Sequence, residues 1–286
     1  MQSRFAKIYH QRVLKRQIHL AVLTLCRNME LFVGSEHSET YQKYRPTYPP
    51  AMYDFIAEYC KTGTGSLGSA VDVGCGTGLS TFPLCKYFQS VIGTDVSETQ
   101  INTAQTTHRQ SNLSFCTSKA ESLAFLSDCS VDLVTVAQAM HWIEQEPFYR
   151  EVKRILRPGG SLVVYGYGVC TLDNSDADKI IDKFYRNDLK GFWDSRRHHI
   201  ENMYQEICLP FPGWERNLDF IMQNKWSTHE MVGYLSTWSA WRQYLKQSPG
   251  SGLLVDIQHQ LDDVYQGREL TISWPVFILL GRKALK

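Results

Sequence analysis

The sequence VDVGCGTG places three glycines, Gly74, Gly76 and Gly78, directly after a short apolar run. Glycine has no Cβ, so such a cluster lets the backbone turn sharply and lets a ligand approach it closely. About twenty residues later, VIGTDVS brings in Asp95, where a carboxylate can accept two hydrogen bonds from ribose hydroxyls. This spacing predicts a nucleotide-type ligand, and a tight turn without a ligand is the alternative.

Two cofactors, NAD and S-adenosylmethionine (SAM), fit a glycine turn followed by an acid. The dinucleotide fingerprint G-x-G-x-x-G needs a glycine where this chain has Leu79, whereas the spacing G-x-G-x-G is met. Asp72, two residues before the first glycine, would repel a pyrophosphate but could orient the amino group of a methionine moiety. The charge favours SAM, and a nicotinamide-dependent oxidoreductase is an alternative.

Short β-branched runs alternate with segments of helical length from Ser69 to Gly168. The strand-like runs are AVDVG, SVIGTDV, LSFCT, VDLVTVA and GSLVVYGYG, and the segments between them include LSTFPLCKYF, SETQINTAQTTHR and EPFYREVKRIL. This alternation predicts an α/β fold with a doubly wound, mostly parallel sheet. Ligands of such sheets bind at the carboxyl ends of the strands, where the glycine turn and Asp95 would lie.

Composition predicts one large domain. The chain has 286 residues, of which 43% are hydrophobic, and 30 basic residues nearly balance 29 acidic ones, which argues against a nucleic-acid partner. Its apolar stretches are too short to span a membrane. Eight cysteines without a C-x-x-C pair favour reduced thiols, and no metal site is expected.

Residues 1–28 differ from the rest because they are basic and contain no acidic residue. This pattern is typical of a mitochondrial transit peptide, whereas a variable extension before Met29 would leave the protein cytoplasmic, which is the reading we favour. We expect a single domain at 29–286, with a helical cap at 36–60, a cofactor-binding core at 69–168, and a lid with late strands at 169–286. The oligomeric state is left open.

The ordered set VDVGCGTG, GTDVS, SKAESLAF, VDLVTVAQAMHW and ILRPGGSLVVYG resembles the motifs of the class I SAM-dependent methyltransferases, in particular the methyltransferase type 11 group. The further stretches YRPTYP, AMHWIE, FWDSRR, YLSTWSAW and FILLGRK are similar to the trans-aconitate methyltransferase branch. The resemblance implies a Rossmann-like methyltransferase fold with a seven-stranded sheet, a helical N-terminal cap, a C-terminal helical lid and SAM as cofactor.

The resemblance also implies roles for individual residues. The methionine end of SAM would be held by Asp72, Gly74, Gly76 and Gly78, the ribose by Asp95 and the adenine face by Val96. Ala120 and Glu121 would read the adenine edge, although the order Lys-Ala-Glu departs from the family pattern, and Glu121 as a solvated helix charge is the alternative. Ala137 and Gln138 would close the fourth strand beneath the sulfonium.

Two further groups are candidates for the acceptor side. His141 could orient an acceptor oxygen or take a proton, and Trp142 could exclude water, with loop packing as the alternative for both. Arg45 could pair with a carboxylate or be a solvated arginine at a helix end.

The segment FWDSRRHHI carries the remaining candidates. If it is helical, Trp193, Arg196 and Arg197 share one face and form an aromatic and cationic wall for an anionic substrate; a basic surface helix anchored by Trp193 is the alternative. His198 and His199 should not bind a metal, because adjacent side chains point apart and no spaced ligand accompanies them.

Methyl transfer needs a nucleophile held in line with the methyl carbon. A carboxylate is already deprotonated at neutral pH, so it needs no general base. We therefore expect transfer to a carboxylate oxygen of a small anionic molecule. An N-methyltransferase acting on an amine or a protein, and a SAM-binding protein without turnover, are the alternatives.

Overall fold

The computed structural model describes residues 44–285 and divides them into two compact units. The larger unit holds residues 46–173, 194–225 and 271–285, and the smaller holds 44–45, 174–193 and 226–270. The extension at 1–28 and the first part of the cap predicted at 36–60 lie outside the described residues. A single domain at 29–286 stays a prediction.

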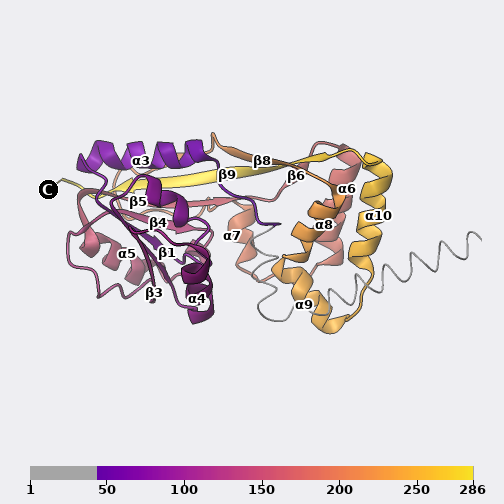
Figure 1. The fold of residues 1–286 in the computed structure, drawn as a ribbon, viewed down its shortest axis with the longest axis horizontal. Helices are drawn as coiled ribbons and strands as arrows, with labels where there is room; N and C mark the ends of the chain where they lie inside the picture. Colours follow the sequence, from indigo (N-terminus) through magenta and orange to yellow (C-terminus); the bar gives the residue numbers. More distant parts are fainter. Residues whose placement is uncertain (1–43, 286) are drawn as a thin grey trace, which may run out of the picture. The chain divides into compact units, whose positions relative to one another are not determined.

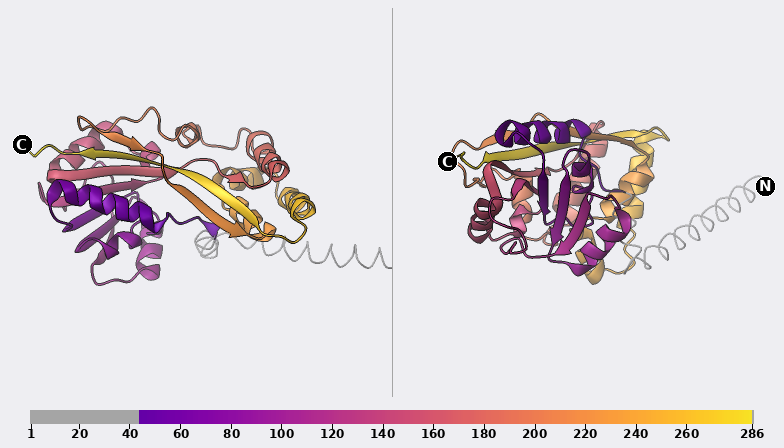
Figure 2. Two further views of the ribbon diagram at one scale, coloured as in Figure 1. Left: turned by 90° about the horizontal axis from the view of Figure 1, so that it is seen from above. Right: turned by 60° about the vertical axis from the view of Figure 1, so that its left-hand side comes forward.

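The sheet confirms the α/β, doubly wound architecture. Its strands are β1 (Ser69–Val73), β2 (Ser90–Asp95), β3 (Leu113–Thr117), β4 (Val131–Ala137), β5 (Leu156–Tyr167), β6 (Thr171–Leu172), β7 (Glu215–Asn217), β8 (Ile221–Trp226) and β9 (Leu270–Arg282). The order is β3-β2-β1-β4-β5-β9-β6, and β7 and β8 also pair with β9. Neighbours among β1 to β5 are parallel, whereas β9 runs antiparallel to β5 (Figure 2). Among the described residues the sheet has nine strands instead of seven, because the stretch ERNLDFIMQ contributes to two short ones and β6 adds another.

Helices of the larger unit cover both faces of this sheet. They are α3 (Pro50–Thr64), the 3-10 helix η1 (Phe82–Lys86), α4 (Glu98–Thr107), the 3-10 helix η2 (Met140–Trp142), α5 (Gln145–Ile155) and α7 (Arg197–Glu201). Figure 1 shows α3 on one face and α5 on the other. Successive side chains of a strand point to opposite faces of the sheet. Val71 and Val73, two residues apart on β1, accordingly share a buried cluster with Phe148 and Val152 of α5.

One predicted helix is much shorter than its sequence suggests. The stretch LSTFPLCKYF after the glycines forms only η1, and Pro83 lies at its start. Proline has no backbone N–H and clashes with the preceding turn, so an α-helix cannot run through this position from Leu79. The glycine turn is therefore followed by a compact loop.

The smaller unit is helical. It contains α6 (Ser175–Lys183), the π-helical turn η3 (Phe184–Asp188), α8 (Thr228–Ser236), α9 (Ser239–Gln247) and α10 (Leu253–Tyr265), and α10 packs against α6 and α8. Aromatic rings fill its interior; Phe184, for example, stacks on Trp238 with 5.7 Å between ring centroids. Among residues 44–285, none of the helices combines the length and apolarity that crossing a bilayer requires.

Asp72 is an acid in the middle of the sheet. Its residue surface is fully buried, and its two carboxylate oxygens accept hydrogen bonds from the hydroxyls of Thr81 at 2.6 Å and Thr135 at 2.7 Å. Burial disfavours the charged form and raises the pKa of Asp72 to about 6, against the two hydroxyls, which lower it. Asp72 thus ties β1 to β4 and to the loop after the glycines.

This raised pKa makes a stability prediction. The folded protein holds the Asp72 proton more tightly than the unfolded chain does, so its contribution is present below about pH 4 and is lost as the pH rises through about 6. Asp72→Asn removes this titration. The free energy of unfolding of wild type minus that of the variant should fall by on the order of 2 kcal/mol between pH 4 and pH 7. Urea titrations measure it, and a difference independent of pH would contradict the assignment.

Candidate functional site

The glycine turn follows β1, and open space lies beside its central glycine, Gly76. Gly76 has φ of 55°, in the left-handed region, and a Cβ placed on it would meet no atom within 4 Å. Gly74 and Gly78 differ, because their added Cβ atoms would lie 2.6 Å from Cβ of Ala139 and 2.8 Å from Cζ of Phe115. Gly74 and Gly78 therefore allow neighbouring side chains to pack closely on the turn. Gly76 instead borders open space, which a ligand could occupy.

Asp95 holds this turn in place from the end of β2. One carboxylate oxygen accepts a hydrogen bond from the backbone N–H of Gly76 at 2.9 Å, and the other accepts one from the N–H of Ser97, also at 2.9 Å. Each oxygen keeps lone-pair capacity for a further donor. The glycine turn and the acid, separate in sequence, thus form one site.

Val96 lies next to this acid and is exposed. Its residue surface is 68% accessible, which suits an apolar contact with a flat aromatic ring. The remaining lone pairs of Asp95, the open side of Gly76 and the exposed face of Val96 together fit the ribose, the methionine end and the adenine of SAM.

Asp72 lies on β1, two residues before the first glycine of the turn. Because its oxygens are occupied by threonine hydroxyls and none of its surface is exposed, the structure gives it a positioning role. Direct contact between Asp72 and the amino group of SAM stays a prediction.

Ala120 and Glu121 lie in the loop after β3. Ala120 is buried, and Glu121 Oε1 accepts a hydrogen bond from the backbone N–H of Glu144, at the start of α5, at 3.0 Å. The reading of Glu121 as a solvated helix charge is wrong, because this loop contains no helix. Recognition of the adenine edge by Ala120 and Glu121 stays a prediction.

The end of β4 is strained at Gln138, which follows Ala137. Gln138 has φ of 55°, a conformation that costs a non-glycine residue on the order of 1–3 kcal/mol. Its backbone N–H and its side-chain amide hold it there by donating to the carbonyl oxygens of Tyr165 at 2.9 Å and Tyr167 at 3.0 Å. Such strain is concentrated at functional sites.

His141 follows on η2 and is paired with a tyrosine. Its Nδ1 lies 2.6 Å from the hydroxyl of Tyr204. Burial, together with the nearby His199, Arg197 and Arg196, lowers the pKa of His141 to about 4, and Asp194 opposes this weakly. His141 is therefore a neutral imidazole at physiological pH.

Trp142 is exposed and carries a cation on its ring. It is 53% accessible, and the guanidinium carbon of Arg196 lies 3.8 Å from the ring centroid. Arg196 also donates to both oxygens of Asp194, at 2.9 and 3.1 Å. The structure thus places Trp142, Arg196 and His141 in one neighbourhood; their role toward the acceptor stays a prediction.

The predicted helical wall of Trp193, Arg196 and Arg197 is wrong in its secondary structure. Residues 193–196 form turns, and α7 begins only at Arg197. The carboxylate of Asp194 accepts a hydrogen bond from the backbone N–H of Arg196 at 3.0 Å, which stabilises the turn. Trp193 belongs to the smaller unit, where its indole N–H donates to the carbonyl oxygen of Tyr185 at 3.0 Å.

Arg45 also belongs to the smaller unit. Its guanidinium donates to the carbonyl oxygen of Thr237 at 3.2 Å and lies 5.8 Å from the ring centroid of Tyr234. The reading of Arg45 as a solvated arginine at a helix end does not hold, because its side chain is engaged inside this unit. A role for Arg45 and Trp193 in substrate binding stays a prediction.

His198 and His199 do not point apart as expected. Their ring centroids are 3.9 Å apart, and His199 pairs with Glu206. The imidazole and carboxylate atoms of the three residues lie within 4.8 Å of one another, so the argument against a metal from side-chain direction was wrong. Two of the three residues are exposed, and we assign no ion to them; the absence of a metal stays a prediction.

Tyr204 and Arg216 are site residues that the sequence did not reveal. Tyr204 lies 63 residues after His141, in a stretch whose apolar residues are spaced as in an ordinary packed helix. Arg216, on β7, donates to the carbonyl oxygens of Met203 at 2.7 Å and Tyr204 at 2.8 Å. No pattern in the sequence links these positions; Tyr204 packs on Phe277 of β9, and β7 pairs with the same strand.

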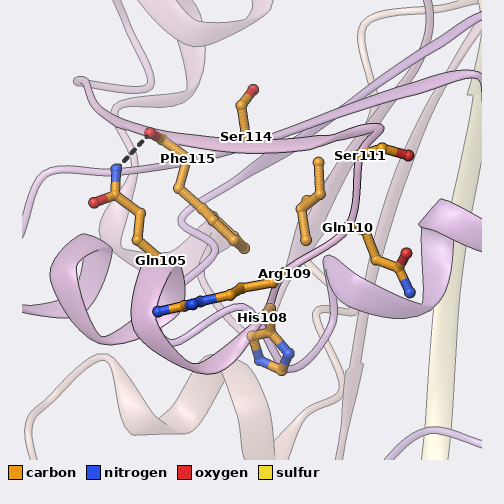
Figure 3. Close-up of a pocket in the computed structure, with 8 residues that line it drawn as sticks. Gln105, His108, Arg109, Gln110, Ser111, Ser114 and Phe115 are labelled. Carbon is orange, nitrogen blue, oxygen red and sulfur yellow. Dashed lines mark hydrogen bonds between the residues drawn. The ribbon is translucent and has the colours of Figure 1, made fainter.

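A separate cavity of about 720 Å³ lies beside α4 and β3 (Figure 3). Its lining consists of Gln105, His108, Arg109, Gln110, Ser111, Leu113, Ser114 and Phe115. It shares one wall with the glycine turn, since Phe115 packs where a side chain on Gly78 would be. The sequence did not single out this cavity.

Comparison with known proteins gives one family. Residues 71–164 match the methyltransferase domain family. A methyltransferase-type protein of Dictyostelium discoideum is 33% identical over 253 residues, which cover 86% of this chain and 93% of that protein. An S-adenosylmethionine-dependent methyltransferase of Saccharomyces cerevisiae is 24% identical, with coverage of 86% and 95%.

A solved structure agrees with these sequences. A type II methyltransferase from Anaeromyxobacter dehalogenans is 30% identical and has a TM-score of 0.75, and the match covers 85% of this chain and 100% of that one. Placement in the trans-aconitate branch stays a prediction. Together with the glycine turn held by Asp95, these matches show that the chain belongs to the class I SAM-dependent methyltransferases and that SAM is its cofactor.

Proposed function

We propose that this enzyme methylates a carboxylate oxygen of a small anionic molecule. The observation that carries the proposal is the position of His141 near guanidinium groups: its ring centroid lies 5.0 Å from that of Trp142, on which Arg196 stacks at 3.8 Å. Burial, His199, Arg197 and Arg196 lower the pKa of His141. A carboxylate is attracted by these guanidinium groups and the ammonium form of an amine is repelled, although Asp194, which pairs with Arg196, offsets part of the positive charge. A histidine with a pKa of about 4 is also a weak base, and a carboxylate acceptor does not need one.

The residues of the larger unit would divide the work. When bound, SAM supplies an electrophilic methyl group. Gly76 and Asp95 would hold the cofactor, and Arg197 would attract the carboxylate. His141 would orient the acceptor oxygen, and Trp142, with Arg196 stacked on its ring, would keep water away. Positioning of this kind can supply much of the rate of an in-line displacement.

The open side of Gly76 gives a direct test of cofactor binding. Gly76→Ala puts a methyl group into that space and should raise the Kd for SAM at least tenfold, which corresponds to about 1.4 kcal/mol. Gly65→Ala is the matched control, because Gly65 also has a positive φ, of 72°, and no atom within 4 Å of an added Cβ. Both variants should lose about 1 kcal/mol of stability. Calorimetry that finds equal affinity for SAM in the two variants would refute the assignment of Gly76 to the SAM site.

The acceptor class is tested by methylation itself. The enzyme is incubated with SAM and either a pool of small carboxylic acids or a pool of small amines, and mass spectrometry seeks products that have gained one methyl group. Products should arise from the acids. Methylated amines without methyl esters would overturn the proposed acceptor class while leaving the methyltransferase assignment intact.

Arg197 should act on the acceptor and not on the cofactor. Arg197→Ala removes a cation near His141, so the KM for a methylated acid from that pool should rise about tenfold, as expected for one lost charged hydrogen bond, while the Kd for SAM changes less than twofold. Arg150→Ala, at an exposed position of α5, is the control and should change neither. An equal loss in KM and in Kd for SAM would contradict this role.

A further inference from the structure

The hydroxyl of Tyr204 is a hydrogen-bond donor at a fixed place. Tyr204 is fully buried, and its ring meets Phe277 edge to face with 4.9 Å between centroids. Burial raises the pKa of this phenol, so it keeps its proton at physiological pH. The hydroxyl lies 2.6 Å from Nδ1 of His141. Because an imidazole nitrogen is a better acceptor than a phenol oxygen, the phenol hydrogen is directed to that nitrogen.

This direction determines where His141 carries its proton. A neutral imidazole has one N–H and one acceptor nitrogen. If Nδ1 accepts from Tyr204, the ring proton must be on Nε2. An imidazole in this tautomer presents a donor from Nε2 and cannot take a proton there.

The protein keeps Tyr204 in place at the expense of backbone strain. Met203 and Tyr204 have φ of 49° and 55°, a conformation that side chains rarely adopt and that costs on the order of 1–3 kcal/mol for each residue. Arg216 holds both carbonyl groups, at 2.7 and 2.8 Å. Because the fold keeps two strained residues and holds both with one arginine, we infer that the position of the Tyr204 phenol is important for function.

We propose that Tyr204 is a positioning residue that fixes His141 with its proton on Nε2, so that His141 donates a hydrogen bond to the acceptor oxygen instead of removing a proton from it. The inference rests on the proposed function for the acceptor oxygen. Its first part, the tautomer, concerns the enzyme alone. A donor at that oxygen suits a carboxylate, which arrives already ionised, and would not help to deprotonate an amine.

Nuclear magnetic resonance of the full chain labelled with ¹⁵N-histidine tests the tautomer without an acceptor. His141→Gln identifies the signals of His141. In the wild type at pH 7, these signals should show a protonated Nε2 and an unprotonated Nδ1. In Tyr204→Phe, which loses only the hydroxyl, they should shift to a mixture of the two tautomers.

Tyr149→Phe is the matched control. Tyr149 is also buried, and its hydroxyl donates to the carbonyl oxygen of Cys208 at 3.0 Å. Removing either hydroxyl should cost a similar free energy of unfolding, of about 1–2 kcal/mol, but only Tyr204→Phe should move the His141 signals. A wild-type His141 with its proton on Nδ1, or a tautomer unchanged in Tyr204→Phe, would overturn the proposal.

The rate of methyl transfer tests the positioning role of Tyr204 separately from the proposed acceptor class. With the pool of carboxylic acids, Tyr204→Phe should lower the rate of methyl-ester formation about tenfold, while Tyr149→Phe keeps it and the Kd for SAM is unchanged in both. A normal rate in a Tyr204→Phe enzyme with mixed tautomers would refute the positioning role. If no acid is methylated but the tautomer shifts as expected, the acceptor class fails and the fixed tautomer stands.

Discussion

The glycine turn depends on one carboxylate that joins two strand ends. Asp95, at the end of β2, accepts hydrogen bonds from the backbone N–H groups of Gly76 and Ser97. The first bond fixes the turn after β1, and the second fixes the chain that enters α4. Because β1 and β2 pair in parallel and in register, both strands end at the same edge, and the carboxylate spans the gap between them. Hydrogen bonds to a charged acceptor are stronger than those between neutral groups.

A second constraint is electrostatic and concerns His141. His141 is held neutral by burial and by nearby cations, while Tyr204 takes up one of its ring nitrogens. The histidine thus lacks the properties of a strong base but keeps those of a neutral hydrogen-bond donor. Arg197 and Arg196 lie near it, and Arg196 also pairs with Asp194. The anionic, already deprotonated acceptor that we propose would match both conditions.

The sequence predicts local features well and contacts between distant segments poorly. The alternation of strands and helices, the glycine turn and Asp95 depend on neighbouring residues, and the structure places them as expected. The helix expected after the glycines shrank to η1 because Pro83 interrupts it, and the helix expected around Arg196 starts only after a turn stabilised by Asp194. Tyr204 could not be foreseen, since its position depends on packing against Phe277 of β9 and on two residues with positive φ. Such contacts arise from tertiary packing, which periodicity does not encode.

Hydrogen–deuterium exchange of the wild-type enzyme, with and without SAM, tests the central claim most directly. If the cofactor binds against the glycine turn and Asp95, amides in residues 73–80 and 94–98 should exchange more slowly when SAM is present. Amides beside the cavity at 105–115 serve as an internal reference and should change less. Strong protection at 105–115 with none at 73–80 would show that SAM binds elsewhere and would contradict the account.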